Sequence, residues 1–369
     1  MNTTKELDIG CQDHGQEANQ RKYEVIKIAV DVHAESYVCC RQLENATPQP
    51  PQKMSPEDFL KFVAKQLPLC QKLWVCYEAG PTGFWLARKL QEQAVECVVV
   101  RPCRLDAYGR RVNNDRTDVM ALSERLDRYV AGNQKALATV RIPTLEEELK
   151  RAEGRQRDQL HKKLQSFAAM GRSLMLLHGH RMQGEWWETK GWEVIERDLP
   201  QALVNLLIPL RQSVQFLAEH LKSADGKLAS AQANQERPLG CGAKTLALID
   251  QEVCDWNRFG NRKQIGSYGG LCGGISASGN QHADLPITKA GNPRLRRYVV
   301  EMAWRMVYWQ PQSPLIQRWK HVLLTPKKSH VRGRKKAIIA VARRLLVDLW
   351  RWRTGRVTLE QLGWKPIGA

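Results

Sequence analysis

The fold is decided by a short apolar run that ends in an acid, Glu24-Val25-Ile26-Lys27-Ile28-Ala29-Val30-Asp31. Its apolar and β-branched residues predict a β-strand. Residues 36–43 predict a second strand, which follows closely enough to form a hairpin with the first. Residues 72–78 predict a third strand, and this one also ends in an acid, Glu78. The sequence therefore places two carboxylates at strand ends.

Helices alternate with these strands. Helical patterns cover about 56–67 and 84–93, a short buried strand is expected over 95–100, and a helix runs from Asp115 to about Val130. This order is typical of a layered α/β domain. Acids at the carboxyl ends of strands project into the crevice where such sheets bind ligands. We therefore expect Asp31 and Glu78 to converge.

Two more acids open the last of these helices, in Val112-Asn113-Asn114-Asp115-Arg116-Thr117-Asp118-Val119-Met120. Residues three apart lie on nearly one helix face, where Asp115 and Asp118 repel each other unless a cation separates them. Acids are common at helix starts without any ligand. Together with Asp31 and Glu78, however, the pair makes four acids in an order that predicts an RNase H-like site for a divalent metal. The alternative is that each is a solvated carboxylate.

Composition limits the partners. The 369 residues include 57 Lys and Arg against 38 Asp and Glu, which gives a net charge of +19. Such an excess predicts a polyanionic partner, most plausibly nucleic acid. The ten cysteines contain no C-x-x-C pair, which argues against a zinc ribbon and for a reducing compartment. Without a long apolar run or signal peptide, we expect a cytoplasmic, nucleoid-associated protein with no membrane contact.

The middle of the chain, residues 143–236, predicts long helices, whereas residues 1–22 predict a disordered N-terminus. Apolar residues recur at helical spacing at Leu145, Leu149, Ala152, Leu160, Leu164 and Phe167, and at Leu210, Val214, Leu217 and Leu221. The second set has the steps of a coiled-coil seam. We expect a helical hairpin used for dimerisation; the alternative is that these helices pack within their own chain.

The last part, residues 237–369, combines glycine-rich turns with basic helices. A Gly240-x-Gly242 turn leads into a helix, where backbone N–H groups can hold a phosphate. Residues 266–280 predict a flexible glycine-rich loop that carries serines, and a helix rich in arginine follows, continuing to about Trp309. A serine hydroxyl beside such cations suits phosphodiester chemistry. The candidate nucleic-acid-binding residues are Lys289, Arg294, Arg296, Arg297, Lys335 and Lys336.

The order of these motifs resembles the DEDD-type insertion-sequence transposases, also described as bridge-RNA-guided serine recombinases. The matching pieces are Val30-Asp31-Val32, Glu78-Ala79-Gly80, Asp115-x-x-Asp118, Gly240-x-Gly242, Tyr268-x-Gly270-Leu271, Ser278-Gly279 and Ile287-Thr288-Lys289-x-Gly291-Asn292-x-x-Leu295-Arg296. The proline that the family has shortly after Gly270-Leu271 is missing here.

The resemblance implies three domains: a RuvC-like RNase H-fold catalytic domain over 23–142, a helical coiled-coil segment over 143–236, and a mainly α-helical transposase domain over 237–369. The family's acidic tetrad carries over to Asp31, Glu78, Asp115 and Asp118, which would hold Mg²⁺. Its nucleophile carries over to Ser278, with Ser276 as a rival.

The resemblance also implies partners and an activity. The partners would be double-stranded donor and target DNA, a bridge RNA that pairs with both, and further copies of the chain in a homodimer or homotetramer. The expected reaction is DNA strand cleavage and exchange. Two alternatives stay open: a metal-dependent junction nuclease in which water attacks, and a nucleic-acid-binding protein without catalysis.

Overall fold

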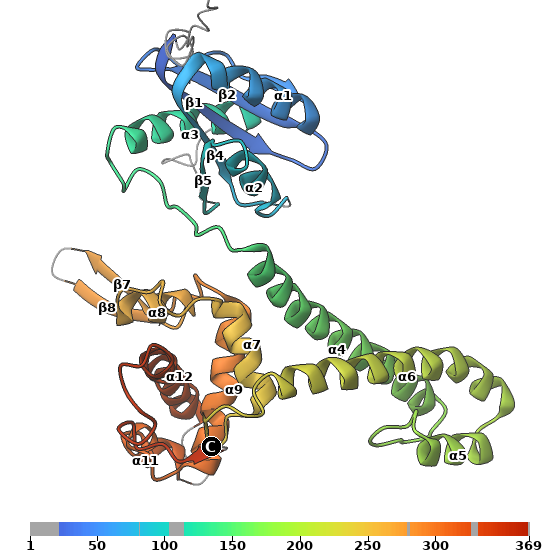
Figure 1. Ribbon diagram of the computed structural model, residues 1–369. Coiled ribbons are helices and arrows are strands. Elements are labelled where there is room, and N and C mark those ends of the chain that lie inside the picture. Colours follow the sequence, from blue (N-terminus) through green and yellow to red (C-terminus); the bar gives the residue numbers. More distant parts are fainter. Residues whose placement is uncertain (1–21, 81, 103–113, 279–280, 326–330, 368–369) are drawn as a thin grey trace, which may run out of the picture. The chain divides into compact units, whose positions relative to one another are not determined.

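The computed structural model describes residues 22–80, 82–102, 114–278, 281–325 and 331–367 (Figure 1). The chain forms two compact units, Met1–Pro143 and Thr144–Ala369. Of the segment expected to be disordered, residues 1–21 lie outside the described residues. Among the described helices, none combines the length and the apolar character that a membrane crossing requires.

The first unit is built on a mixed sheet in the order β3-β2-β1-β4-β5. Its strands are β1 (Tyr23–Val32), β2 (Tyr37–Leu43), β3 (Gln52–Met54), β4 (Cys70–Glu78) and β5 (Glu96–Val100). β2 runs antiparallel to β1 and β3, whereas β4 runs parallel to β1 and β5. The α/β pattern and the expected hairpin are confirmed. The short strand β3 was missed, since only three residues form it.

Helices cover both faces of this sheet. They are α1 (Pro56–Gln66), α2 (Trp85–Gln91) and α3 (Asp115–Val130), with a 3-10 turn at Leu67–Leu69. Successive side chains of a strand point to opposite faces. Ile28 and Val30 of β1 accordingly join the core under α1 and α2, while Ala29 joins the core under α3. Among the described helices of this unit, α3 is therefore the one whose buried residues join the core on this second face.

The second unit begins with a long helical hairpin. It consists of α4 (Leu145–Leu177), α5 (Thr189–Asp198) and α6 (Gln201–Ser230), and α4 packs along α6 (Figure 1). Trp186 is fully buried between them and donates a hydrogen bond from Nε1 to the carbonyl of Ala168 (3.0 Å). A Cβ built on Gly171 would lie 2.2 Å from this ring, so only glycine lets the helix approach the tryptophan.

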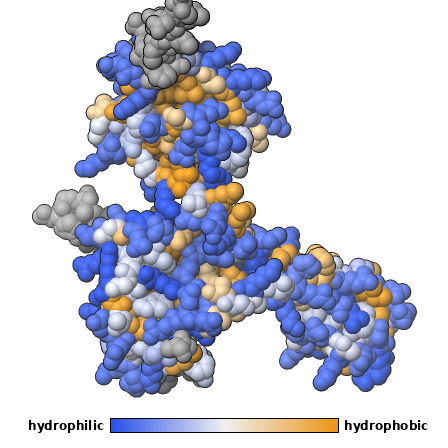
Figure 2. Space-filling view, in the orientation of Figure 1, coloured by the Kyte–Doolittle hydropathy of each residue, from blue (hydrophilic) through white to orange (hydrophobic). Residues whose placement is uncertain are grey.

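The predicted seam on α6 packs inside the chain, since Val214, Leu217 and Leu221 are all buried. This favours the alternative that these helices pack within their own chain. Leu145 and Leu149, from the predicted stripe on α4, are instead 57% exposed. The hairpin also exposes Leu177 on α4 and Phe216 on α6, although most of the surface seen in Figure 2 is hydrophilic. Dimerisation through this segment stays a prediction.

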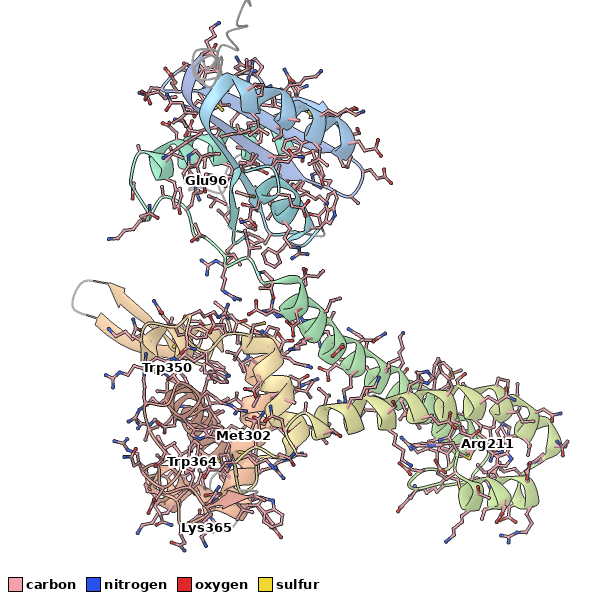
Figure 3. All side chains as sticks on the ribbon, viewed as in Figure 1. Glu96, Arg211, Met302, Trp350, Trp364 and Lys365 are labelled. Carbon is pink, nitrogen blue, oxygen red and sulfur yellow. The ribbon has the colours of Figure 1, made fainter. Side chains whose placement is uncertain are left out.

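The rest of the second unit is a helical body with one hairpin. It contains α7 (Ala243–Val253), α8 (Arg262–Tyr268), α9 (Pro293–Trp309), α10 (Pro314–Gln317), α11 (Lys320–Leu323) and α12 (Val331–Arg353). The predicted helix after the Gly240-x-Gly242 turn and the predicted end of α9 are confirmed. A small sheet joins β6 (Arg237–Pro238) to β9 (Pro366–Ile367). Met302, Trp350 and Trp364, labelled in Figure 3, lie in the common core of these helices.

The glycine-rich passage differs from the expectation. The predicted loop is a two-stranded hairpin, with β7 (Gly273–Ser278) paired antiparallel to β8 (Gln281–Ile287). Six glycines in residues 266–280 suggested flexibility, but only two residues, Gly279 and Asn280, separate the strands. A Gly-Asn pair between two strand-forming runs is typical of a hairpin turn. The loop prediction was therefore wrong.

Candidate functional site

The sheet register brings two of the predicted acids to one place. Val30 of β1 pairs with Tyr77 of β4, so Asp31 and Glu78 are the next residues along two neighbouring parallel strands. Neighbouring strands lie about 4.8 Å apart. Residues two positions apart in a strand lie on the same face, so Asp31 shares its face with Ala29 and Glu78 shares its face with Cys76. Ala29 and Cys76 belong to the core under α3. Asp31, one residue before the end of β1, and Glu78, the last residue of β4, thus lie on the sheet face that α3 covers.

Helix α3 supplies the other two acids at its first turn. Asn114 caps the helix, because its side chain accepts a hydrogen bond from the N–H of Arg116 (3.0 Å). Asp115 is the first helical residue and Asp118 follows three positions later, with Val119 buried in the core beside it. The cap therefore fixes where the helix starts, and with it the position of both carboxylates.

The structure brings Asp31 and Asp115 together with a histidine that sequence reasoning missed. Ligand atoms of Asp31, His33 and Asp115 all lie within 4.8 Å of one another. His33 Nε2 is 3.3 Å from Asp31 Oδ2 and 3.7 Å from Asp115 Oδ2. All three side chains reach solvent, at 29% exposure for Asp31, 51% for His33 and 54% for Asp115. A soluble ion can therefore enter.

The remaining two acids lie outside this set of atoms in the described part of the chain. Glu78 sits where β4 pairs with Val100 of β5, and its Oε1 atom is shielded from solvent. Asp118 is half-buried on α3. The structure thus joins two of the four predicted ligands through His33 and leaves Glu78 and Asp118 as neighbours of that group.

These donors fit a divalent cation. Carboxylate oxygens are the ligands that Mg²⁺ prefers, and an imidazole nitrogen suits Mn²⁺ and other transition metals better. His33 Nε2 lies within 3.7 Å of a carboxylate oxygen of both acids, and a bound cation would offset the repulsion between the two carboxylates. Asp31 and Asp115 would hold the ion directly, with His33 as a further donor.

The candidate nucleophiles lie in the second unit. Ser278 is the last residue of β7 and pairs with Gln281, and Ser276 pairs with Ala283. The side chains of residues 275–284 lie outside the described part of the structure, as do Gly279 and Asn280. The backbone places both serines in a strand, with Ser278 next to the turn.

The motif residues at the base of this hairpin pack against each other. A Cβ on Gly291 would lie 2.5 Å from the N atom of Gly270, so the two segments touch through backbone atoms. The N–H of Asn292 donates to the carbonyl of Tyr268 (2.7 Å), and the Asn292 side chain caps α9. Arg296 donates to the carbonyls of Gly269 and Lys289 (both 3.2 Å). This part of the motif holds the hairpin in place.

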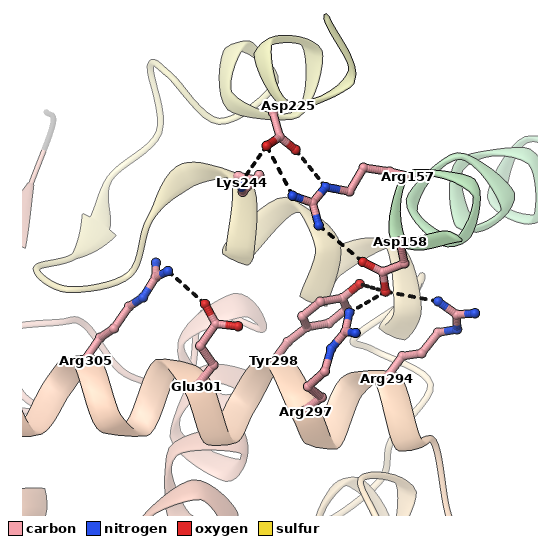
Figure 4. A network of polar contacts seen from close by, with 9 residues as sticks. All are labelled: Arg157, Asp158, Asp225, Lys244, Arg294, Arg297, Tyr298, Glu301 and Arg305. Carbon is pink, nitrogen blue, oxygen red and sulfur yellow. Dashed lines mark hydrogen bonds and ion pairs between the residues drawn. The ribbon is translucent and has the colours of Figure 1, made fainter. Parts of the chain in front are cut away.

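Two further predicted cations, Arg294 and Arg297, bind a buried acid on α4 (Figure 4). Asp158 is 2% exposed and accepts from Arg294 (3.0 Å), from Arg297 and from the hydroxyl of Tyr298 (2.6 Å). Arg157 lies 3.4 Å from the same carboxylate. Arg294, Arg296 and Arg297 therefore have structural partners, and their contact with nucleic acid stays a prediction.

Charge governs the titration of this network. Burial alone would raise the pKa of Asp158, but the Tyr298 hydroxyl and the charge of Arg297 outweigh it and hold the pKa below its usual value. Burial and then the negative charge of Asp158 raise the pKa of Tyr298. On the neighbouring helix α6, Asp225 likewise has a lowered pKa, because hydrogen bonds from Arg157 and Lys244 outweigh burial. The carboxylates of Asp158 and Asp225 are therefore ionised at neutral pH, while the Tyr298 hydroxyl keeps its proton.

Comparison with known proteins finds a family match within the second unit. Residues 237–317, which include the β7–β8 hairpin and α10, match the family described as "Transposase IS116/IS110/IS902 family". This part of the chain is similar to that transposase family.

Relatives cover most of the chain. It is 29% identical over 322 residues to "Putative transposase y4rJ" of Sinorhizobium fredii, which covers 78% of each chain. It is 24% identical over 282 residues to the transposase for insertion sequence element IS1328 of Yersinia enterocolitica, covering 72% of this chain and 80% of that one. A third relative is the transposase for IS1111A of Coxiella burnetii, at 23% over 297 residues, 76% of this chain and 77% of that one. These matches extend over both units.

Proposed function

We propose that this protein is a DNA transposase that cleaves and rejoins the strands of an insertion element. The observation that carries the proposal is the group formed by Asp31, His33 and Asp115, in a chain whose residues 237–317 match a transposase family. The net charge of +19 fits a polyanionic substrate. The order β3-β2-β1-β4-β5 and the acids on one sheet face are compatible with a RuvC-like RNase H fold.

In this proposal Asp31 and Asp115 would bind Mg²⁺ directly, and Glu78 and Asp118 would complete the acidic tetrad. When bound, the ion polarises the scissile phosphate and stabilises the charge that develops on its oxygens. The helix start at Asn114 positions two of the carboxylates, and the ends of β1 and β4 position the others. His33, beside Asp31 and Asp115, would supply a nitrogen donor.

The nucleophile in this proposal is Ser278, with Ser276 as the rival. Its hydroxyl attacks phosphorus, so that a new P–O bond to serine forms and the bond to one deoxyribose oxygen breaks. The serine proton is released, and the departing deoxyribose oxygen takes up a proton to leave a hydroxyl end. The reverse reaction with another strand's hydroxyl rejoins DNA without an external energy source. Acids and serine lie in different units, and the reaction requires both at one phosphate.

Further parts of the proposal concern partners. A bridge RNA would pair with donor and target DNA, and copies of the chain would associate as a homodimer or homotetramer through the α4–α6 hairpin. Its exposed Leu177 and Phe216 fit such contacts. The protein would act in the bacterial cytoplasm at the nucleoid. Sequencing of RNA that co-purifies with the protein tests the guide.

The catalytic test uses covalent trapping on donor DNA. We expect wild-type protein with Mg²⁺ to form a protein–DNA adduct, Ser278→Ala to lose it, and Asp115→Asn to lose Mn²⁺ binding measured by calorimetry. Glu124→Gln, an exposed acid on the same helix, serves as the control and should retain both. An adduct that persists in Ser278→Ala but not in Ser276→Ala would move the role to Ser276. Cleavage without any adduct would support the alternative nuclease, in which water attacks.

A further inference from the structure

A groove of about 840 Å³ runs along the second unit between α8, α12 and the base of the β7–β8 hairpin. We call it the basic groove, because six cations line it: Arg262, Lys263, Lys335, Lys336, Arg343 and Arg344. Its lining contains no acidic residue among those that the structure describes. Lys335 and Lys336 are among the cations predicted from the sequence, while Arg262 and Lys263 come from a helix that sequence reasoning had not connected with them.

Most cations of the basic groove differ from those of the Asp158 network, because only one of them has an acidic partner in the described part of the chain. Arg344 pairs with Asp348 (2.8 Å). For the other five, the described part of the chain offers no ion pair. Like charges gathered at one place repel each other, and that repulsion disfavours the fold until an anion arrives. The basic groove is therefore suited to several phosphates in a row.

The floor of the basic groove is apolar. Leu271, Leu285 and Ile339 line the groove together with the cations, and Leu285 is 48% exposed. A duplex presents phosphates to such a surface and keeps its bases stacked inside, so an aliphatic floor would find no partner. An unpaired strand can turn its bases onto the floor while its phosphates reach the cations. The volume is also near the upper end for ligand sites, which leaves room for more than one nucleotide.

We propose that the basic groove binds an unpaired stretch of DNA, the strand that leads to the serine hairpin. Gly273, Leu285 and Ile287 belong both to the groove and to the strands of that hairpin. A DNA strand held in the groove thereby lies next to β7, which ends at Ser278. That the occupant is DNA rests on the proposed function; that it is an unpaired strand rests on the cations and the floor.

The test measures binding of labelled oligonucleotides by fluorescence anisotropy, in EDTA so that no cleavage occurs. The groove variant Lys336→Ala/Arg343→Ala should bind single-stranded DNA at least tenfold more weakly. Its slope of log affinity against log salt should fall by about 1.4, at about 0.7 for each phosphate that the variant can no longer neutralise. The control Lys190→Ala/Lys222→Ala removes two exposed cations of the helical hairpin and should leave single-strand binding unchanged.

A second variant separates the floor from the charge. Leu285→Gln keeps the net charge and should weaken single-strand binding while duplex binding stays as in the wild type. Unchanged single-strand binding in both groove variants would overturn the proposal. If the groove variants lost only duplex binding, the proposal would be overturned in favour of duplex DNA as the occupant. If they lost binding to an RNA strand more than to a DNA strand, it would be overturned in favour of RNA. Failure of the adduct assay with intact groove binding would count against the catalytic proposal only.

Discussion

Replacing the buried acid Asp158 by asparagine tests what fastens the α4–α6 hairpin to the C-terminal helices. The change keeps the size of the side chain but removes the charge that Arg294, Arg297 and Arg157 share. Breaking a buried ion pair costs about 3–5 kcal/mol. The side chains of Arg294 and Arg297 are 25% and 48% exposed and can return to water, so we expect the lower end, about 3 kcal/mol.

The measurement is thermal and urea-induced unfolding. A destabilisation of about 3 kcal/mol should lower the melting temperature of the second unit by about 6–12 °C. The matched control is Asp198→Asn, which removes an exposed acid paired with Arg197 on α5 and should leave the midpoint unchanged. Equal midpoints for Asp158→Asn and wild type would refute the reasoning, since they would mean that the network contributes nothing net.

Three further predictions concern single positions. Gly171→Ala should destabilise the hairpin by about 2 kcal/mol through overlap with Trp186, whereas Gly226→Ala, where a Cβ meets nothing within 4 Å, should stabilise it; urea unfolding compares them. Asn114→Ala should cost about 1 kcal/mol by removing the cap of α3 and should weaken Mn²⁺ binding, while Asn114→Ser should restore both. Folding lowers the pKa of Asp158, so its contribution to the free energy of unfolding is complete above about pH 5 and is lost as acid protonates the folded state. The stability difference between wild type and Asp158→Asn should therefore shrink below about pH 4. Unfolding measured in a pH series checks this.

The strands and helices of the first unit could largely be predicted from local patterns in the sequence. The apolar runs that end at Asp31 and Glu78 form β1 and β4, and α3 starts at Asp115 as expected. Each of these features depends on neighbouring residues, because strand propensity and helix capping act over a few positions. This is why the place of the acids could be predicted before their distances were known.

Features that depend on distant residues could not be predicted in this way. His33 is an exposed histidine in a turn, and nothing nearby shows that α3 will bring Asp115 within 3.7 Å of it. Asp158 resembles any acid on a charged helix, because its partners follow 136 to 140 residues later. The β7–β8 hairpin did have a local signal in Gly279-Asn280, which the density of glycines obscured.

The fastening of α4 at Asp158 has a mechanical consequence. Beyond that residue the helix continues to Leu177, which at 1.5 Å per residue is an arm of about 28 Å. A tilt of about 10° at the fastening would carry the far end about 5 Å sideways over such an arm. Small rearrangements among the arginine partners of Asp158 would therefore become large displacements at the far end of the helix.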